Sequence, residues 1–239
     1  MTSGHLASGG APSGDNLYPS TLELTFGDEE LNLDVPAGVW NPTPHGRFLG
    51  HKLLELDFSG DHVLELGTGC GIHAILLARR GAAKLTLTEI APEIIDNARH
   101  NLSKHDVGVP IETVVCDWIQ VPGGPFDVLV TNPPFAKSGK KNRRYFIQTM
   151  IQEAHKLLVP GGRLVFVQSS MANIPKTIEE LELNGMSVRI VGETSGPFRP
   201  YYYEDEQFML DLTKNPSSYF LVDGKHHERL CVFEATLQG

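Results

Sequence analysis

The chain has 239 residues, of which 41% are hydrophobic and 21% charged, and its formal net charge is −9. This length suits one α/β domain with a full core, and the composition is typical of a water-soluble globular protein. No apolar run approaches the length needed to cross a bilayer, so we expect no membrane partner. The acidic charge disfavours broad, sequence-independent binding to nucleic acid.

Two features bear on cellular location and domain number. Residues 1–16 are rich in Gly, Ser and Ala without a basic start or an apolar core, which predicts a disordered tail and no signal peptide. The three cysteines, Cys70, Cys116 and Cys231, form an odd set without metal-type spacing, as is typical of reduced thiols inside a cell. We therefore expect a cytoplasmic protein in which residues 17–239 form a single domain.

From residue 17 onward the chain alternates strand-like and helix-like segments. Ser20 to Pro36 alternates apolar and polar residues around a Gly27–Glu30 turn, which predicts a β-hairpin within an N-terminal segment 17–45. The remaining pattern predicts strands at 62–66, 84–89, 111–116, 126–130, 163–168, 187–191 and 230–236, and helices at 72–80, 92–104, 143–158 and 175–184. Strands rich in Val, Leu and Ile that alternate with helices predict a Rossmann-like α/β fold with a seven-stranded, mostly parallel sheet covered on both faces. Residues 194–228 form an insert before the last strand, too long for a simple hairpin.

A glycine-rich turn follows the strand at 62–66, in the run Glu65-Leu66-Gly67-Thr68-Gly69-Cys70-Gly71. A strand, glycine turn and helix in this order allow a cofactor to approach bare backbone at a helix N-terminus. A dinucleotide fingerprint has its third glycine one residue later, where Ile72 stands, so a pyrophosphate cradle is the weaker interpretation. Glu89 ends the next strand, where a carboxylate can accept hydrogen bonds from both hydroxyls of a ribose. These residues predict a nucleoside-containing cofactor.

The tetrapeptide Asn132-Pro133-Pro134-Phe135 follows the apolar strand at 126–130. The two prolines fix their own backbone angles and hold the preceding residue extended, so the loop is rigid. Neither proline has an N–H, and Asn132 offers an acceptor oxygen, so the loop can grip a substrate NH2 through its oxygens. In isolation a loop breaker after a buried strand is the favoured interpretation of the tetrapeptide, but behind the glycine motif we interpret it as the catalytic loop.

In this order, the two motifs resemble those of the class I S-adenosylmethionine-dependent methyltransferases. The tetrapeptide narrows the resemblance to the amino-methylating branch, which includes release-factor glutamine, adenine-amine DNA and small-domain ribosomal RNA guanine methyltransferases. The resemblance implies S-adenosylmethionine as cofactor. We expect no metal, because the candidate histidines lack partners at metal-ligand spacing. The resemblance also implies the cofactor-binding residues: for the methionine end Glu65, Gly67, Thr68, Gly69 and Gly71, for the ribose Glu89, for the adenine edge Asp117 and Trp118, and beside the methyl group Asn132. The segment Val39 to Gly46 resembles the motif by which this branch closes over the methionine.

The resemblance leads us to expect methyl transfer to the nitrogen of a planar amide or amine. The Asn132 side-chain oxygen and the Pro133 carbonyl would accept its two N–H groups, Pro134 would stiffen the loop, and Phe135 would stack on the planar group. Glutamine-methylating relatives usually carry a helical recognition domain upstream, and this chain has only a hairpin there. We therefore favour a small molecule or a protein side chain over nucleic acid as the substrate. The alternatives are an RNA or DNA base amine methyltransferase, a noncatalytic cofactor-binding partner subunit, and a nicotinamide-dependent oxidoreductase.

Two further clusters lie near these motifs in the sequence. Tyr201, Tyr202 and Tyr203 in the insert are either a lid that reads the substrate or part of an amphipathic surface loop. Five basic residues behind the tetrapeptide favour a solvated loop and helix start over a nucleic-acid patch: Lys137, Lys140, Lys141, Arg143 and Arg144. His45 and His73 lack metal-ligand spacing and are expected to be packed or solvent-facing. Cys70 is expected to be a small spacer and not a nucleophile.

Overall fold

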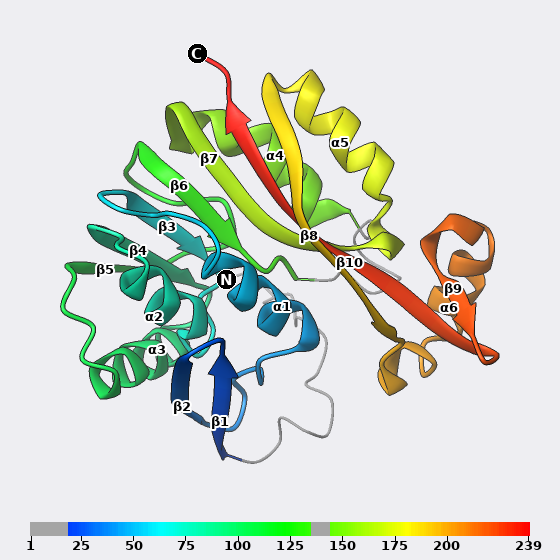
Figure 1. Ribbon diagram of the computed structural model, residues 1–239, viewed down its shortest axis with the longest axis horizontal. Coiled ribbons are helices and arrows are strands. Elements are labelled where there is room, and N and C mark those ends of the chain that lie inside the picture. The colour runs from blue at the N-terminus through cyan, green and yellow to red at the C-terminus, as the bar shows by residue number, and fades with distance from the viewer. Residues whose placement is uncertain (1–18, 135–143) are drawn as a thin grey trace, which may run out of the picture.

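The computed structural model of the protein describes residues 19–134 and 144–239 (Figure 1). The described chain begins with an antiparallel hairpin of β1 (Ser20–Phe26) and β2 (Glu29–Val35). Gly27 turns the chain with a φ of 58°, a conformation that glycine adopts without a steric penalty. The hairpin buries Phe26 and Leu33 against the main core. The predicted hairpin is confirmed, whereas the predicted tail of residues 1–16 lies outside the described residues.

The main sheet has the strand order β5-β4-β3-β6-β7-β10-β8, and the short β9 pairs with β10 at its edge. Strands β3 to β7 pair in parallel, while β10 is antiparallel to both β7 and β8. The strands are β3 (His62–Leu66), β4 (Lys84–Glu89), β5 (Ile111–Val115), β6 (Phe126–Thr131), β7 (Leu158–Ser169), β8 (Met186–Pro197), β9 (Phe220–Val222) and β10 (Lys225–Leu237). The predicted Rossmann-like fold with a mostly parallel sheet is confirmed, and β9 is an additional short strand.

Helices cover both faces of this sheet (Figure 1). They are α1 (Pro44–Leu53), α2 (Ile72–Arg79), α3 (Pro92–Lys104), α4 (Tyr145–Leu157), α5 (Ile174–Leu183) and α6 (Glu206–Thr213). Consecutive strand residues point to opposite faces, so Val63 joins the core under α2 and α3 while Leu64 joins the core under α4 and α5. Within the described ranges, no helix is both long and apolar enough to span a membrane.

The sequence pattern did not predict helix α1, which begins at the end of the expected N-terminal segment 17–45. It follows Thr43, whose side-chain oxygen accepts a hydrogen bond from the Gly46 backbone N–H at 3.3 Å. Pro44 occupies the first helical turn, where its missing N–H costs nothing. A Thr-Pro pair is a recognised helix start, but the turn that follows has too few apolar residues to show a clear helical period.

The insert 194–228 is more ordered than a loop. Strands β8 and β10 run well beyond their predicted ends and pair along the insert, up to His227 opposite Pro197. They carry α6 and β9 out from the sheet as a lobe (Figure 1). This lobe has a small core of its own, formed by Met171, Phe198, Tyr202, Phe208 and Leu212. The end of β8, Gly192 to Pro197, is polar or glycine-rich, so apolar alternation could not indicate a strand there.

Candidate functional site

The two sequence motifs leave the sheet side by side. Strand β3 lies between β4 and β6 in the sheet. Strands β4 and β5 extend the sheet on one side of β3, and β6 and β7 extend it on the other, so the strand order reverses at the border between β3 and β6. Ligands bind at such switch points in open α/β sheets, beyond the carboxyl ends of the strands. Leu66 pairs with Thr131 at this border, and the Thr131 hydroxyl donates a hydrogen bond to the Leu66 carbonyl at 2.8 Å. The glycine turn and Asn132 therefore begin at neighbouring positions.

The glycines of the turn serve two different purposes. Gly69 has a φ of 56°, and a Cβ placed on it would meet no atom within 4 Å. Gly69 therefore presents bare backbone to open space. Gly71 has a φ of 85°, and a Cβ there would lie 3.1 Å from Leu102 and 3.3 Å from Ala98 on α3. Gly71 therefore permits the close packing of α2 against α3, while Gly69 leaves room for a ligand.

Glu89 is held against the glycine turn at the end of β4. One carboxylate oxygen accepts the Gly69 backbone N–H and the other accepts the Ile90 N–H, both at 3.0 Å. Each oxygen keeps a further lone pair for a ligand hydroxyl. This geometry is compatible with the predicted ribose contact, which stays a prediction.

Glu65 lies beneath the turn and has protein partners on both oxygens. It is 1% exposed, accepts a hydrogen bond from the Thr68 hydroxyl at 2.7 Å, and lies 3.2 Å from His73 Nδ1. His73 Nε2 lies 2.8 Å from the Gly46 carbonyl oxygen. A carbonyl oxygen can only accept, so His73 Nε2 is the donor in its contact with Gly46. Glu65 thus shapes the turn and ties it to α1, and its predicted contact with the methionine is untested.

Asn132 stands at the head of the second loop, against the first turn of α1. Asn132 and Pro133 are half-buried and Pro134 is exposed, whereas Phe135 lies outside the described residues. A Cβ placed on Gly46 would lie 3.3 Å from Asn132 Nδ2. The resemblance of Val39 to Gly46 to a cofactor-closing segment therefore has a structural counterpart, because Gly46 reaches both Asn132 and His73.

Comparison with known proteins decides the family. The methyltransferase small domain family matches residues 46–194, which is more than half of the chain. The chain belongs to this family. The resemblance to class I S-adenosylmethionine-dependent methyltransferases of the amino-methylating branch is confirmed, and S-adenosylmethionine is the cofactor. The open backbone at Gly69 and the fixed carboxylate of Glu89 fit such a nucleoside, because they offer it close backbone approach and hydroxyl acceptors.

Similar proteins carry several methyltransferase names. A Methanocaldococcus jannaschii protein provisionally named a protein N5-glutamine methyltransferase is 28% identical over 71% of this chain and 92% of its own length. A Deinococcus radiodurans release factor glutamine methyltransferase is 27% identical over 74% of this chain and 69% of its own. A ribosomal RNA small subunit methyltransferase C of Pseudomonas aeruginosa is 30% identical over 71% of this chain, which spans about half (51%) of that relative.

A solved structure gives the same fold. The 16S ribosomal RNA N2 G1207 methyltransferase of T. thermophilus, in complex with AdoMet and guanosine, superposes with a TM-score of 0.64 at 19% identity. The match covers 95% of this chain and 52% of that chain. At this identity the likeness concerns the fold alone.

The predicted adenine edge of this methyltransferase lies at the end of β5. Asp117 is exposed there, and Trp118 is half-buried with a φ of 51°. The Trp118 indole N–H donates to the Thr149 hydroxyl on α4 at 3.0 Å, and its ring meets Phe146 edge to face. Trp118 is thus committed to packing against α4, while Asp117 is free to face a ligand from the same edge of the sheet as the glycine turn. The adenine contact stays a prediction.

The basic cluster contains a residue with a structural role. Arg144 is 6% exposed and donates to the Ala172 carbonyl, the Thr177 hydroxyl and the Glu180 carboxylate. The interpretation of Arg144 as a solvated or nucleic-acid-facing residue is wrong, because its guanidinium joins the start of α4 to α5. The other members, Lys137, Lys140, Lys141 and Arg143, lie outside the described residues.

The three tyrosines of the insert have different environments. Tyr202 is 3% exposed in the core of the insert, and its hydroxyl donates to Glu228 at 3.5 Å. Burial also raises the pKa of the Tyr202 hydroxyl. Because the Tyr202 side chain is buried, the prediction that it faces a substrate is wrong. Tyr203 is 47% exposed and Tyr201 is half-buried beside Arg199, so the lid interpretation stays a prediction for these two.

Cys70 and the two histidines near the motifs, His45 and His73, are all buried. Burial raises the pKa of the Cys70 thiol to about 12, so the thiolate needed for nucleophilic attack is scarce at neutral pH. His45 and His73 are buried, at 8% and 4% exposure. Their partners are distant in sequence, and no local signal could have identified them. Among the described residues, no group of three or more His, Cys, Asp or Glu side chains is placed to hold a metal ion.

Cofactor binding should depend on pH through Glu89. Burial raises the pKa of its carboxyl group, the nearby Glu65 carboxylate raises it further, and the Ile90 and Gly69 N–H groups oppose this. Only the ionised form accepts two hydroxyl hydrogen bonds, so S-adenosylhomocysteine affinity should fall as pH drops through this raised pKa. The loss should begin at a higher pH than for an ordinary glutamate.

Calorimetric titration of Glu89→Gln over the same pH series provides the test. The variant should bind S-adenosylhomocysteine about 10- to 100-fold more weakly at neutral pH and lose the acid dependence. Glu112→Gln is the matched control, because Glu112 is an exposed carboxylate paired with Lys84 on the neighbouring strand. An acid limb that persists in Glu89→Gln would assign the titration to another group.

Proposed function

We propose that this methyltransferase transfers the methyl group of S-adenosylmethionine to the nitrogen of a planar amide or amine, on a protein side chain or a small molecule. The observation that carries the proposal is the register of β3 and β6, which starts the glycine turn and the Asn132 loop at adjacent positions. An acceptor nitrogen held by Asn132 would therefore lie next to a cofactor held on the glycine turn.

The bound cofactor supplies an electrophilic methyl group on a positively charged sulfur. The Asn132 side-chain oxygen and the Pro133 carbonyl accept the two N–H groups of the acceptor, which aligns its lone pair and withdraws it from conjugation. Transfer would form the new N–C bond as the S–C bond breaks with its electron pair left on sulfur, and the nitrogen would then release a proton to solvent. Alignment of this kind contributes about 7 to 11 kcal/mol in well-oriented pairs. The same oxygens stabilise the positive charge that develops on nitrogen, so no strong base is needed.

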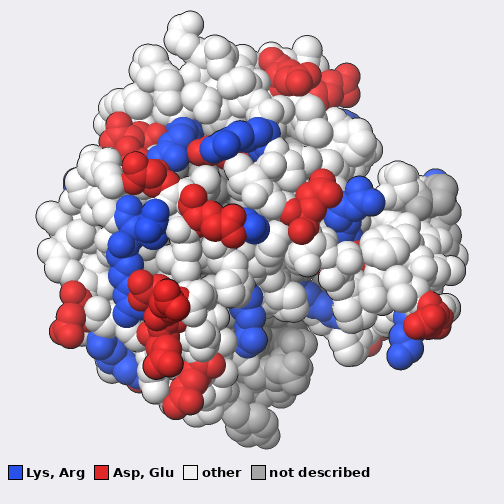
Figure 2. Space-filling view, viewed as in Figure 1, with Lys and Arg blue, Asp and Glu red and all other residues white. Residues whose placement is uncertain are grey.

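Charge favours an amide or small-molecule acceptor over a nucleic acid. The chain carries a net charge of −9, and on the face shown in Figure 2 the Lys and Arg side chains are interspersed with Asp and Glu. The described residues on that face form no single-sign basic field of the kind with which proteins neutralise phosphates. A glutamine side chain meets the requirement for a planar NH2 group, and two relatives are named for glutamine methylation. The ribosomal RNA relative makes a base amine the second candidate.

Transfer from methyl-labelled S-adenosylmethionine into separated protein, metabolite and RNA fractions of a cell extract tests the proposal. Label recovered as an N-methyl amide or amine in protein or metabolites supports it, whereas label in RNA selects the second candidate. Label on oxygen or carbon contradicts the mechanism. Binding of S-adenosylhomocysteine without any transfer would support a noncatalytic subunit, and binding of NAD in its place would support an oxidoreductase.

A further inference from the structure

The dipeptide His45-Gly46 in the first turn of α1 contacts His73, Asn132 and the insert. Gly46 accepts a hydrogen bond from His73 Nε2 at 2.8 Å, which ties α1 to Glu65 and the glycine turn. Gly46 also lies against the Asn132 side chain, since a Cβ placed on it would lie 3.3 Å from Asn132 Nδ2. Any shift of this turn would therefore displace the amide that we propose grips the acceptor.

The insert holds the same turn through His45. Arg199 donates a hydrogen bond to His45 Nδ1, and Glu228 Oε2 lies 3.4 Å from His45 Nε2. Because a guanidinium can only donate, Nδ1 is the acceptor, while Nε2 lies near the Glu228 carboxylate without a hydrogen bond to it. His45 thus lies between a cation and an anion, both carried by the strands and turns of the insert.

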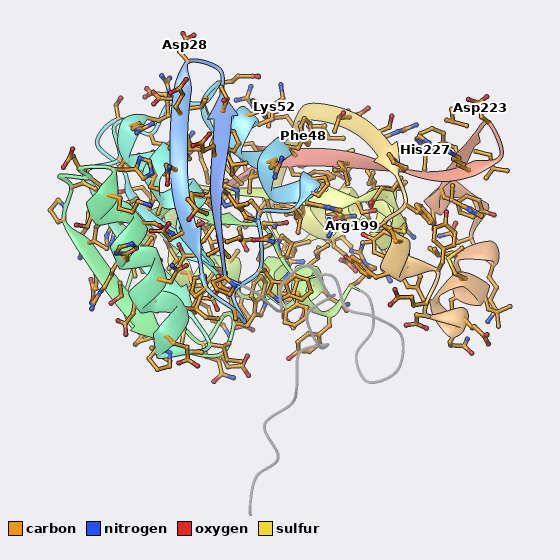
Figure 3. All side chains as sticks on the ribbon, turned by 90° about the horizontal axis from the view of Figure 1, so that it is seen from below. Asp28, Phe48, Lys52, Arg199, Asp223 and His227 are labelled. Atoms are coloured by element: carbon orange, nitrogen blue, oxygen red, sulfur yellow. The ribbon has the colours of Figure 1, made fainter. Side chains whose placement is uncertain are left out.

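This arrangement is buried and tied to the insert core. His45 and Glu228 are 8% and 3% exposed. The Arg199 guanidinium lies 5.7 Å from the centre of the Tyr201 ring and also donates to the Tyr201 hydroxyl at 2.9 Å. Figure 3 shows Arg199 between the insert and α1. Among the described residues, His45 Nε2, Glu228 Oε2 and Arg199 Nε have no hydrogen-bond partner, so the hydrogen bond from Arg199 to His45 Nδ1 is what ties the imidazole to the insert.

We propose that Arg199 is a positioning residue for methyl transfer: by fixing His45, it seats the first turn of α1 against Asn132. The insert would then govern the reaction without touching the reacting atoms. This inference rests on the proposed role of Asn132 in holding the acceptor. It differs from the lid interpretation, because the side chain that matters points into the protein and not toward a substrate.

The side-chain amide of Asn132 offers a readout that needs no substrate. Its NH2 signal in 15N-resolved NMR spectra can be assigned by its loss in Asn132→Asp. Arg199→Met should shift this signal and lower the rate of label transfer by about 10- to 100-fold, because small misplacements are costly in aligned reactions. S-adenosylhomocysteine affinity should change by less than about threefold, since the predicted ribose and glycine-turn contacts lie at the ends of β3 and β4.

Two variants sharpen the test. Arg199→Lys can still donate to His45 and should recover part of the rate. Arg229→Met is the matched control, since Arg229 is an exposed arginine next to Glu228 and should leave both readouts unchanged. If Arg199→Met fails to fold, His45→Gln carries the same expectation, because it removes the imidazole ring.

The outcomes separate this inference from the proposed function. An unchanged Asn132 signal and transfer rate in a folded Arg199→Met or His45→Gln variant would overturn the inference. A shifted signal in protein whose wild-type form transfers no methyl group to nitrogen would leave the coupling standing and refute the proposed function.

Discussion

Asn132→Ala should lower the rate of methyl transfer by about 100- to 1000-fold, the loss typical of removing one well-placed hydrogen-bonding group at a reacting centre. The alanine variant keeps the strand, the prolines and the glycine turn but no longer accepts an acceptor N–H. Single-turnover transfer of labelled methyl into the labelled fraction of the wild type measures the effect. S-adenosylhomocysteine affinity should change by less than about threefold, because the predicted ribose and glycine-turn contacts lie at the ends of β3 and β4.

Asn132→Asp is the informative companion to the alanine variant. Aspartate keeps the side-chain length and an acceptor oxygen, so it should retain more activity than alanine if acceptance of the N–H is what matters. An alanine variant with near-normal turnover would remove Asn132 from the mechanism. Equal losses in alanine and aspartate would show that the NH2 group, and not the oxygen, is the functional part.

The elements predicted correctly are those whose signal is local. Strand β3 and helix α3 occupy the predicted residues, because a buried strand is a short apolar run and α3 begins with a proline that fits its first turn. Helix α1 and the far half of β8 were not predicted, because they lack such a local signal. Their residues are stabilised by partners distant in sequence, such as β10 opposite β8, and carry little periodicity of their own.

The site divides in the same way. Gly69, Glu89 and Asn132 could be named from the sequence, because each lies in a short motif at the end of a strand. His45, His73 and Arg199 could not, since their contacts are brought together only by the fold: Arg199 meets His45 across 154 positions. Tyr202 was misjudged because a run of three tyrosines gives no sign of which ring turns inward.

Arg144→Met should lower the free energy of unfolding by about 3 to 5 kcal/mol, the range for breaking a buried ion pair by removing one partner. Arg144 and Glu180 have side chains that are 8% and 16% exposed, so little solvent is available to replace the lost contact. The substitution also strands the carbonyl oxygens of Ala172 and Asn173, which accept from the same guanidinium. Denaturant unfolding followed by circular dichroism measures the change.

Lys176→Met is the matched control for this ion pair. Lys176 lies 3.9 Å from the same Glu180 carboxylate but is about half exposed, so its removal should cost no more than about 0.5 kcal/mol. Arg144→Lys should fall between the two, because an ammonium keeps the charge but cannot reach the Thr177 hydroxyl, the carboxylate and both carbonyls together. A loss for Arg144→Met as small as that of the control would mean that α4 and α5 are held together by their apolar contacts alone, and that the arginine at the start of α4 is available for another role.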